Sequence, residues 1–284
     1  ANMSRFRERL LVSISLQEIR LRCCLSRLND PADTEALHDL RIGLRSLRSL
    51  LRPLRGLPAV DLLEQACAAV GRLTNPDREL QVLVSELQRR GLPQVAQHYR
   101  ASFRAASAQL SASGELAHLL MLFDGFAPIW RLATREGCMR GLRKHITRRL
   151  ERDLMKIPHS LGASPEDLHV LRLRVKRLRY GSQAYSALTP VSRPGLKLLG
   201  QLQQALGEWN DCQHWLHCSL ADDRLTACRP NWSQRADAAV LRADQLLARF
   251  WRTAGCAEWS DISNAVGTRR AHQAAVMCFI IVTR

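Results

Sequence analysis

The sequence is poor in several features that mark other classes of protein. Aromatic residues make up only 5% of the 284 residues, so the stacking of splayed bases has few candidate side chains. Asn-Gly and Asp-Gly turns and alternating apolar–polar runs are nearly missing, so β-hairpins are not expected. The apolar run near the C-terminus, Ala275 to Val282, is far too short to span a bilayer.

Signals of secretion and of metal binding are also missing. The nine cysteines form no Cys-x-x-Cys motif and no zinc-type spacing with histidine. Reduced thiols in a cytosolic protein are the simplest explanation. The N-terminal stretch ANMSRFRERLL has no apolar signal core. We therefore expect a cytoplasmic protein with no metal ion, no cofactor and no membrane contact.

Motifs of catalysis are missing as well. The sequence contains no GxxxxGK[ST], HExxH or GxSxG motif. Asp77, Glu79, Glu208 and Asp211 stand singly at expected helix starts, where they would cap free backbone amides. A metal-dependent phosphatase needs clustered carboxylates. The protein is therefore not expected to be an enzyme.

What the sequence does contain is leucine at helical spacing and a large excess of positive charge. Leucines recur every three or four residues between breakers such as Thr74-Asn75-Pro76 and Arg229-Pro230, which predicts an all-α protein. Lys and Arg number 42 against 26 Asp and Glu, a formal charge of +16. Such a charge favours a polyanionic partner.

One segment of the chain occurs twice. Leu37 to Arg52 reads LHDLRIGLRSLRSLLR and Leu168 to Gln183 reads LHVLRLRVKRLRYGSQ, and the two align without gaps at an offset of 131 residues (His169 minus His38). This internal repeat predicts two helical bundles related by a pseudo-two-fold axis. We expect one domain over residues 1–284, with repeat halves at about 4–125 and 137–255 and a C-terminal extension at 256–284.

Each copy places cations along one face of a helix beside a row of leucines. At about 100° per residue the cations of the first copy share a sector of about 80°, over about 21 Å of helix. Acidic partners are almost absent from both segments, so these faces need an external anion, and arginine forks suit phosphate oxygens. The candidate binding residues are His38, Arg41, Arg45, Arg48 and Arg52 in the first copy, His169, Arg172, Lys176, Arg177 and Arg179 in the second, and Arg148 and Arg152 on the preceding helix.

The pattern H-x-x-R-x-x-x-[RK]-x-x-R in two copies, with LRVKRLRY and LGEWND in the second half, resembles the CHAD domain, the conserved histidine α-helical domain. The resemblance covers nearly the whole chain. It implies two helical bundles around a basic central cleft that binds inorganic polyphosphate, and association with polyphosphate granules. Ser46 departs from the pattern, which usually has a second consecutive basic residue there, and Gly43 is expected to weaken its helix locally.

Two other functions fit the same residues. Phosphate-ready arginines also suit weak, nonspecific binding of nucleic acid, although the stripes lack the Asn and Gln that read adenine. A scaffold whose basic face docks an acidic protein is the third reading. The residues do not predict an oligomeric state.

Overall fold

We describe the protein from a computed structural model, which describes residues 2–254 except residues 29, 31, 32, 34, 101–109, 111 and 163. Ten α-helices and two 3-10 helices form the regular structure of these residues, and none of them lies in a β-strand. The predicted all-α fold is confirmed. The predicted C-terminal extension, with its apolar stretch, lies outside the described residues.

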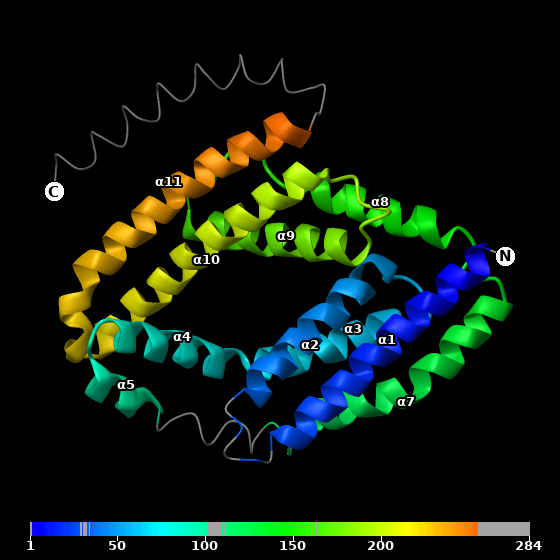
Figure 1. Ribbon diagram of the computed structural model, residues 1–284, viewed down its shortest axis with the longest axis horizontal. Helices are drawn as coiled ribbons and strands as arrows, with labels where there is room; N and C mark the ends of the chain where they lie inside the picture. The colour runs from blue at the N-terminus through cyan, green and yellow to red at the C-terminus, as the bar shows by residue number, and fades with distance from the viewer. Residues whose placement is uncertain are drawn as a thin grey trace.

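The helices fall into two groups along the chain (Figure 1). The first group ends before residue 136 and comprises α1 Asn2–Arg27, α2 Ala36–Leu51, η1 Arg52–Leu54, α3 Val60–Leu73, α4 Asn75–Arg89, α5 Pro93–Arg100 and α7 Gly114–Arg135. The second group comprises α8 Leu142–Leu154, α9 Pro165–Ala184, α10 Arg193–Ala221, η3 Asp223–Cys228 and α11 Arg229–Ala254.

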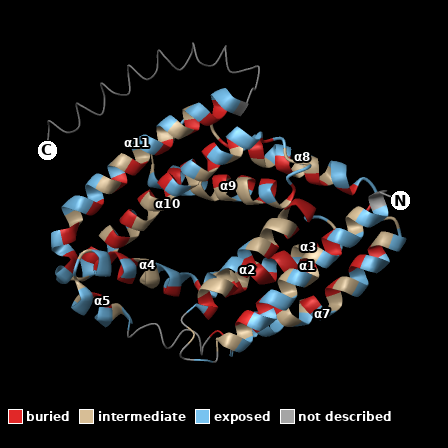
Figure 2. Cartoon of the chain, in the orientation of Figure 1, coloured by how far each residue is buried: buried red, intermediate tan, exposed pale blue. Residues whose placement is uncertain are grey.

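The buried residues form two hydrophobic cores. The first is built mainly by α1, α2, α3, α7 and α8, and the second mainly by α4, α9, α10 and α11. The buried positions follow one side of each helix (Figure 2), as the leucine spacing predicted. Each buried leucine stabilises the fold by about 1.5–3 kcal/mol relative to exposure.

The two cores exchange helices between the halves of the chain. Helix α4 belongs to the first half, yet Leu83 and Leu87 pack into the second core. Helix α8 belongs to the second half, and Ile146 and Leu150 pack into the first core. Neither core is complete without a helix from the other half, so the halves interlock. The pseudo-two-fold relation between them stays a prediction.

The breakers predicted most helix ends, but one predicted helix start is wrong and no breaker marked the end of α7 at Arg135. Helix α3 ends at Leu73 and α4 begins at Asn75, and α11 begins at Arg229, as expected. The predicted helix start near Glu208 and Asp211 is wrong, because α10 runs unbroken through both residues. The equivalent stretch of the first half contains Pro76, which cannot continue a helix, and the second half has no proline there. Neither carboxylate therefore caps a helix.

Helix α7 is, among the described helices, the one long and apolar enough to cross a membrane by length and composition alone. Core helices pass the same test. Leu119, Phe123, Phe126 and Trp130 of α7 are buried in the first core, so in this fold the helix packs as a core element.

Candidate anion-binding site

The two repeated segments form α2 and α9, whose C-terminal ends meet (Figure 1). The Tyr185 hydroxyl, which follows α9, donates to the carbonyl of Leu50 in the last turn of α2 at 2.6 Å. Helix α9 begins sharply because Ser164 and Asp167 form a reciprocal capping box and Pro165 occupies its first position. Both helices bury their leucine row, so their cationic rows are left facing out of the cores.

The charges of both cationic rows act on Lys176. Burial is the largest influence on this ammonium, followed by the positive charges of Arg172 on its own helix, of Arg45 and Arg41 on α2, and of Arg52 at the start of η1. Together they lower the pKa of Lys176 to about 8. We call these five residues the Lys176 cluster. A group of like charges at one place, unmatched by an equal number of carboxylates, creates a strong positive potential.

Tyr180 joins the two rows and was missed as a site residue. The guanidinium carbons of Arg45 and of Arg179 each lie 5.3 Å from the centre of the Tyr180 ring. The Tyr180 hydroxyl accepts a hydrogen bond from Gln203 of α10, whose Oε1 in turn accepts from Arg179 at 3.2 Å. An aromatic face flanked by two guanidiniums holds both in place. Its position directly after the LRVKRLR run was the available signal.

Arg41 is held by the chain break between α3 and α4. Its Nη1 donates to Thr74 Oγ1 at 2.5 Å, and its Nη2 donates to Asn75 Oδ1 at 3.1 Å. Burial, then the charge of Arg78, lowers the pKa of Arg41, while Asp77 acts in the opposite direction. The break is therefore part of the site as well as of the fold.

Arg48 and Arg52 rest on a buried carboxylate that sequence reasoning missed. Each donates from Nε to Glu64 Oε1, at 3.0 and 3.1 Å, and Arg55 donates to the other oxygen. Glu64 is 1% exposed. Burial would raise its pKa, but the three guanidiniums outweigh burial and hold the pKa at about 2. One carboxylate thus orients three arginines and leaves a net positive charge. Glu64 lies on α3, 9 to 16 residues along the chain from its three arginines, so no local pattern predicts these contacts.

The α9 row has a different setting. Burial lowers the pKa of Arg172, and Asp211 of α10 and Glu79 of α4 act against that effect. Among the described residues, Arg48 and Arg52 are the cations of the two rows that have a carboxylate within 4.0 Å. The α9 cations are thus not neutralised by direct ion pairs there.

The remaining predicted residues lie at the margins. His38 is half-buried in the first turns of α2, and His169 is exposed in the first turns of α9. Arg177 is exposed, and its charge reaches Arg52. Arg148 and Arg152 are exposed on α8, where Arg152 Nε donates to the carbonyl of Arg148 at 3.3 Å. Neither α8 residue belongs to the Lys176 cluster.

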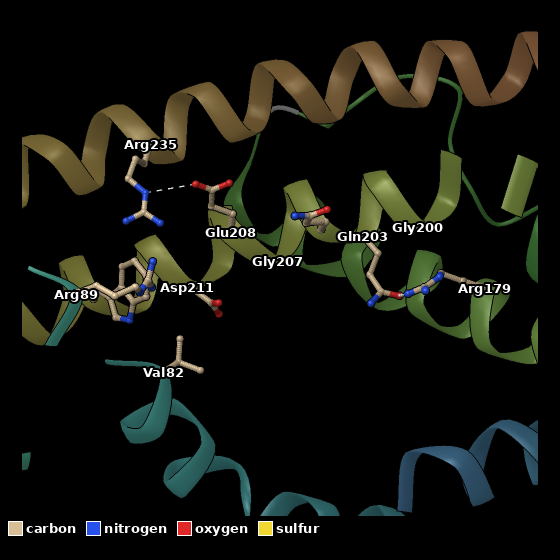
Figure 3. Close-up of a pocket in the computed structure, with 11 residues that line it drawn as sticks. Val82, Arg89, Arg179, Gly200, Gln203, Gly207, Glu208, Asp211 and Arg235 are labelled. Carbon is tan, nitrogen blue, oxygen red and sulfur yellow. Dashed lines mark hydrogen bonds and ion pairs between the residues drawn. The ribbon is translucent and has the colours of Figure 1, made fainter. Parts of the chain in front are cut away.

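A pocket of about 560 Å³ extends from this region along α10. Arg179 stands at one end and Arg89 and Arg235 at the other, with Asp211 between them facing Val82 of α4 (Figure 3). Glu208 on its wall is neutralised by Arg235 and Arg242. The pocket has arginines at both ends and amide and carboxylate groups between them. Its lining therefore carries charges of both signs, whereas the Lys176 cluster consists of cations.

Known proteins share this architecture. The structure is similar to the crystal structure of the CHAD domain from the plant Ricinus communis, with a TM-score of 0.54 and 22% sequence identity. The match covers 86% of this chain and 86% of that one. That likeness concerns the fold. No curated protein matches the chain in sequence. A family model described as the CHAD domain matches residues 20–219, a range that includes both cationic helices, α4 and nearly all of α10, and on this match the chain belongs to the CHAD domain family.

Proposed function

We propose that the protein binds inorganic polyphosphate between α2 and α9, without catalysis, and that this binding associates it with polyphosphate granules. Polyphosphate binding is what membership of the CHAD family implies. The observation that carries the proposal to particular residues is that Arg45 of α2 and Arg179 of α9 lie over the same Tyr180 ring, beside Lys176, on which the charges of both rows act.

The chemistry of the cluster suits a linear chain of phosphates. Such a polymer carries a negative charge on every unit, and arginine and lysine bind phosphate oxygens by charge-assisted hydrogen bonds. Lys176 and the arginines around it repel one another in the free protein. A bound polyanion would relieve this repulsion, which stabilises the complex relative to the free site.

The absence of a reaction is part of the proposal. Among the described residues, no group of three or more His, Cys, Asp or Glu is arranged to hold a metal ion. Glu64 is committed to three arginines, so it is not free to act as a general base. The proposal would fail on this point if purified protein shortened polyphosphate in the presence of magnesium or manganese.

The test is calorimetric titration at near-physiological salt, with long-chain polyphosphate, pyrophosphate and a DNA duplex in separate runs. We expect tight binding of the long polymer alone. Arg41→Ala combined with Arg172→Ala should weaken it at least about tenfold, because each lost charged hydrogen bond costs about 1.5–3 kcal/mol. Helical circular dichroism should be unchanged.

The matched control is Arg193→Ala combined with Arg252→Ala, which removes two exposed arginines outside the cluster. It carries the same change in net charge, so equal weakening by both pairs would mean that binding follows net charge and not the site. Equal or tighter binding of DNA would favour the nucleic-acid function. Binding of neither polymer would favour an acidic protein partner.

A further inference from the structure

Helices α1 and α7 form an antiparallel pair on the outer side of the first core. Arg7 Nη2 donates to the carbonyl of Met139, just beyond α7, at 3.1 Å, and Arg22 Nη2 donates to Asp124 Oδ1 at 2.8 Å. In both contacts the two residue numbers add up to 146. Each residue of α1 therefore lies level with the α7 residue whose number completes that total.

Each helix of this pair exposes a row of large apolar side chains. On α1, Val12, Leu16 and Ile19 are 50%, 49% and 57% exposed. On α7, Met121, Ile129 and Leu132 are 60%, 42% and 53% exposed. At about 100° per residue each row spans a sector of about 60–80°. These six residues, which we call the outer apolar face, are nearly half of the thirteen exposed large hydrophobic residues of the described chain.

Both rows face the same side of the molecule. On α1 the row lies opposite the buried residues Ile14 and Leu21, and on α7 it lies opposite the buried Phe123 and Trp130. The two helices pack on one core, so the sides opposite that core face out together. An apolar face of this kind is typical of a protein interface.

Charge and register favour a second copy of the chain as the partner. Between the two helices, near one end of the face, the charge of Arg22 is neutralised by both Glu18 and Asp124. The outer edge of α1 carries the exposed Arg9, and the exposed Glu136 follows α7 within one residue of the same level. A partner that presents the same face can therefore place its Arg9 near Glu136 of this chain, and its Glu136 near Arg9.

We propose that the outer apolar face is the interface of a homodimer. A two-fold axis parallel to the helix pair places α1 of one copy on α7 of the other, antiparallel and with the levels kept. Leu16 then lies within one residue of the level of Ile129, Val12 within two of Leu132, and Arg9 within one of Glu136. The four helices form an antiparallel bundle, and Gly125, between Met121 and Ile129, leaves room for side chains of the partner.

The dimer carries two Lys176 clusters. If each binds polyphosphate, one long polymer engages both, and the second contact gains from the high effective concentration created by the first. The dimer itself does not depend on the proposed function, since its contacts involve no residue of the cluster. Failure of polyphosphate binding would thus leave the dimer intact, and the reverse also holds.

Sedimentation equilibrium of the full chain without polyphosphate tests the proposal. We expect a mass of twice 32.1 kDa at micromolar concentration. Leu16→Glu combined with Ile129→Glu should halve the mass, because four carboxylates would be buried in the interface. The control, Leu220→Glu combined with Leu241→Glu, changes residues 74% and 66% exposed on other helices and should leave a dimer. Circular dichroism confirms that both variants fold.

A cross-link gives an independent measurement that needs no disruptive substitution. Cys23 is exposed at the end of the α1 row and lies level with residue 123. Under mild oxidation Met121→Cys should form a disulfide-linked dimer through Cys23 of the other copy, and Cys23→Ser should abolish it.

Three outcomes would overturn the proposal. The first is a monomer at all accessible concentrations. The second is a monomer that dimerises once residues 255–284 are removed, which would mean that this segment covers the face. The third is a monomer that binds anionic lipid vesicles and loses this binding on Leu16→Glu, which would assign the face to a lipid surface.

Discussion

At the C-terminal end of α2, Arg48 and the adjoining Arg52 of η1 rest on the buried carboxylate of Glu64. On α9, by contrast, Arg172 and Lys176 are influenced by other cations and only by distant carboxylates. The two helices carry nearly the same motif. The difference shows that the protein fixes the side chains of the first row with a carboxylate, whereas it gives the α9 row no carboxylate in direct contact. A rigid row lowers the entropic cost of binding, and a row without ion-paired carboxylates leaves its charge available to a ligand.

The largest expected effect breaks the rigid row. Glu64→Gln should lower the free energy of unfolding by about 3 kcal/mol, because three partly buried guanidiniums lose their counter-charge. Since Glu64 has its pKa lowered from 4.5 to about 2 in the folded protein, this stability is fully present above pH 4.5 and is lost as pH falls through about 2. Urea unfolding at pH 7 measures the loss.

The exposed Glu151 on α8 provides the control for that measurement. Glu151→Gln should change the free energy of unfolding by less than about 0.5 kcal/mol. Similar values for both variants would mean that Glu64 does not hold the arginines in solution.

The second effect concerns the row without partners. Lys176→Met should weaken polyphosphate binding by about tenfold or more, since a charged hydrogen bond contributes about 1.5–3 kcal/mol. Stability should not fall, because the substitution removes a half-buried charge that four arginines repel. Calorimetry and urea unfolding together measure this separation, and Lys197→Met, at an exposed site on α10, should change neither. A large loss of stability in Lys176→Met would contradict the comparison.

The third effect is the pH dependence of the same side chain. Lys176 has a pKa of about 8 in the free protein, so above that pH a proton must be taken up when a polyanion binds. Affinity for polyphosphate should therefore fall as pH rises from 7 to 9.5, by at most about tenfold per pH unit for one linked proton. Lys176→Arg should flatten the profile, because arginine stays charged. The same slope in both proteins would assign the proton elsewhere.

The linked effect on folding has the opposite sign. The pKa of Lys176 is lowered from 10.5 to about 8 by folding. Its charge therefore disfavours the folded state below pH 8, and this penalty is relieved as pH rises from 8 to 10.5. Stability and affinity should thus move in opposite directions across this range.

The smallest effect tests the link between the rows. Tyr180→Leu removes the ring that both Arg45 and Arg179 cover. A partly exposed cation–π contact contributes about 0.5–1 kcal/mol, so affinity should fall by about two- to fivefold. Tyr180→Phe keeps the ring and should bind like the parental protein. A loss in Tyr180→Phe equal to that in Tyr180→Leu would assign the effect to the hydroxyl and Gln203.

The fold class and the cationic rows could be predicted from the sequence because both depend on local periodicity. Leucine at three- and four-residue spacing defines the buried side of α2 and α9, and the adjacent arginines then have to face outward. Proline and polar breakers marked most helix ends for the same reason. Gly43 shows the limit of such reasoning. It was expected only to weaken its helix, whereas an added Cβ would lie 2.8 Å from Leu21, so the glycine allows α1 and α2 to approach closely.

Only the tertiary structure decided which cations work together. The charges of Arg41 and Arg45 act on Lys176 because α2 and α9 pack together at their C-terminal ends, and Glu64 reaches its arginines because α3 folds back on α2. The exchange of α4 and α8 between the cores likewise follows from long-range packing. A sequence determines which side of a helix is cationic through the fixed pitch of the helix, but contacts between helices depend on how distant segments share a core.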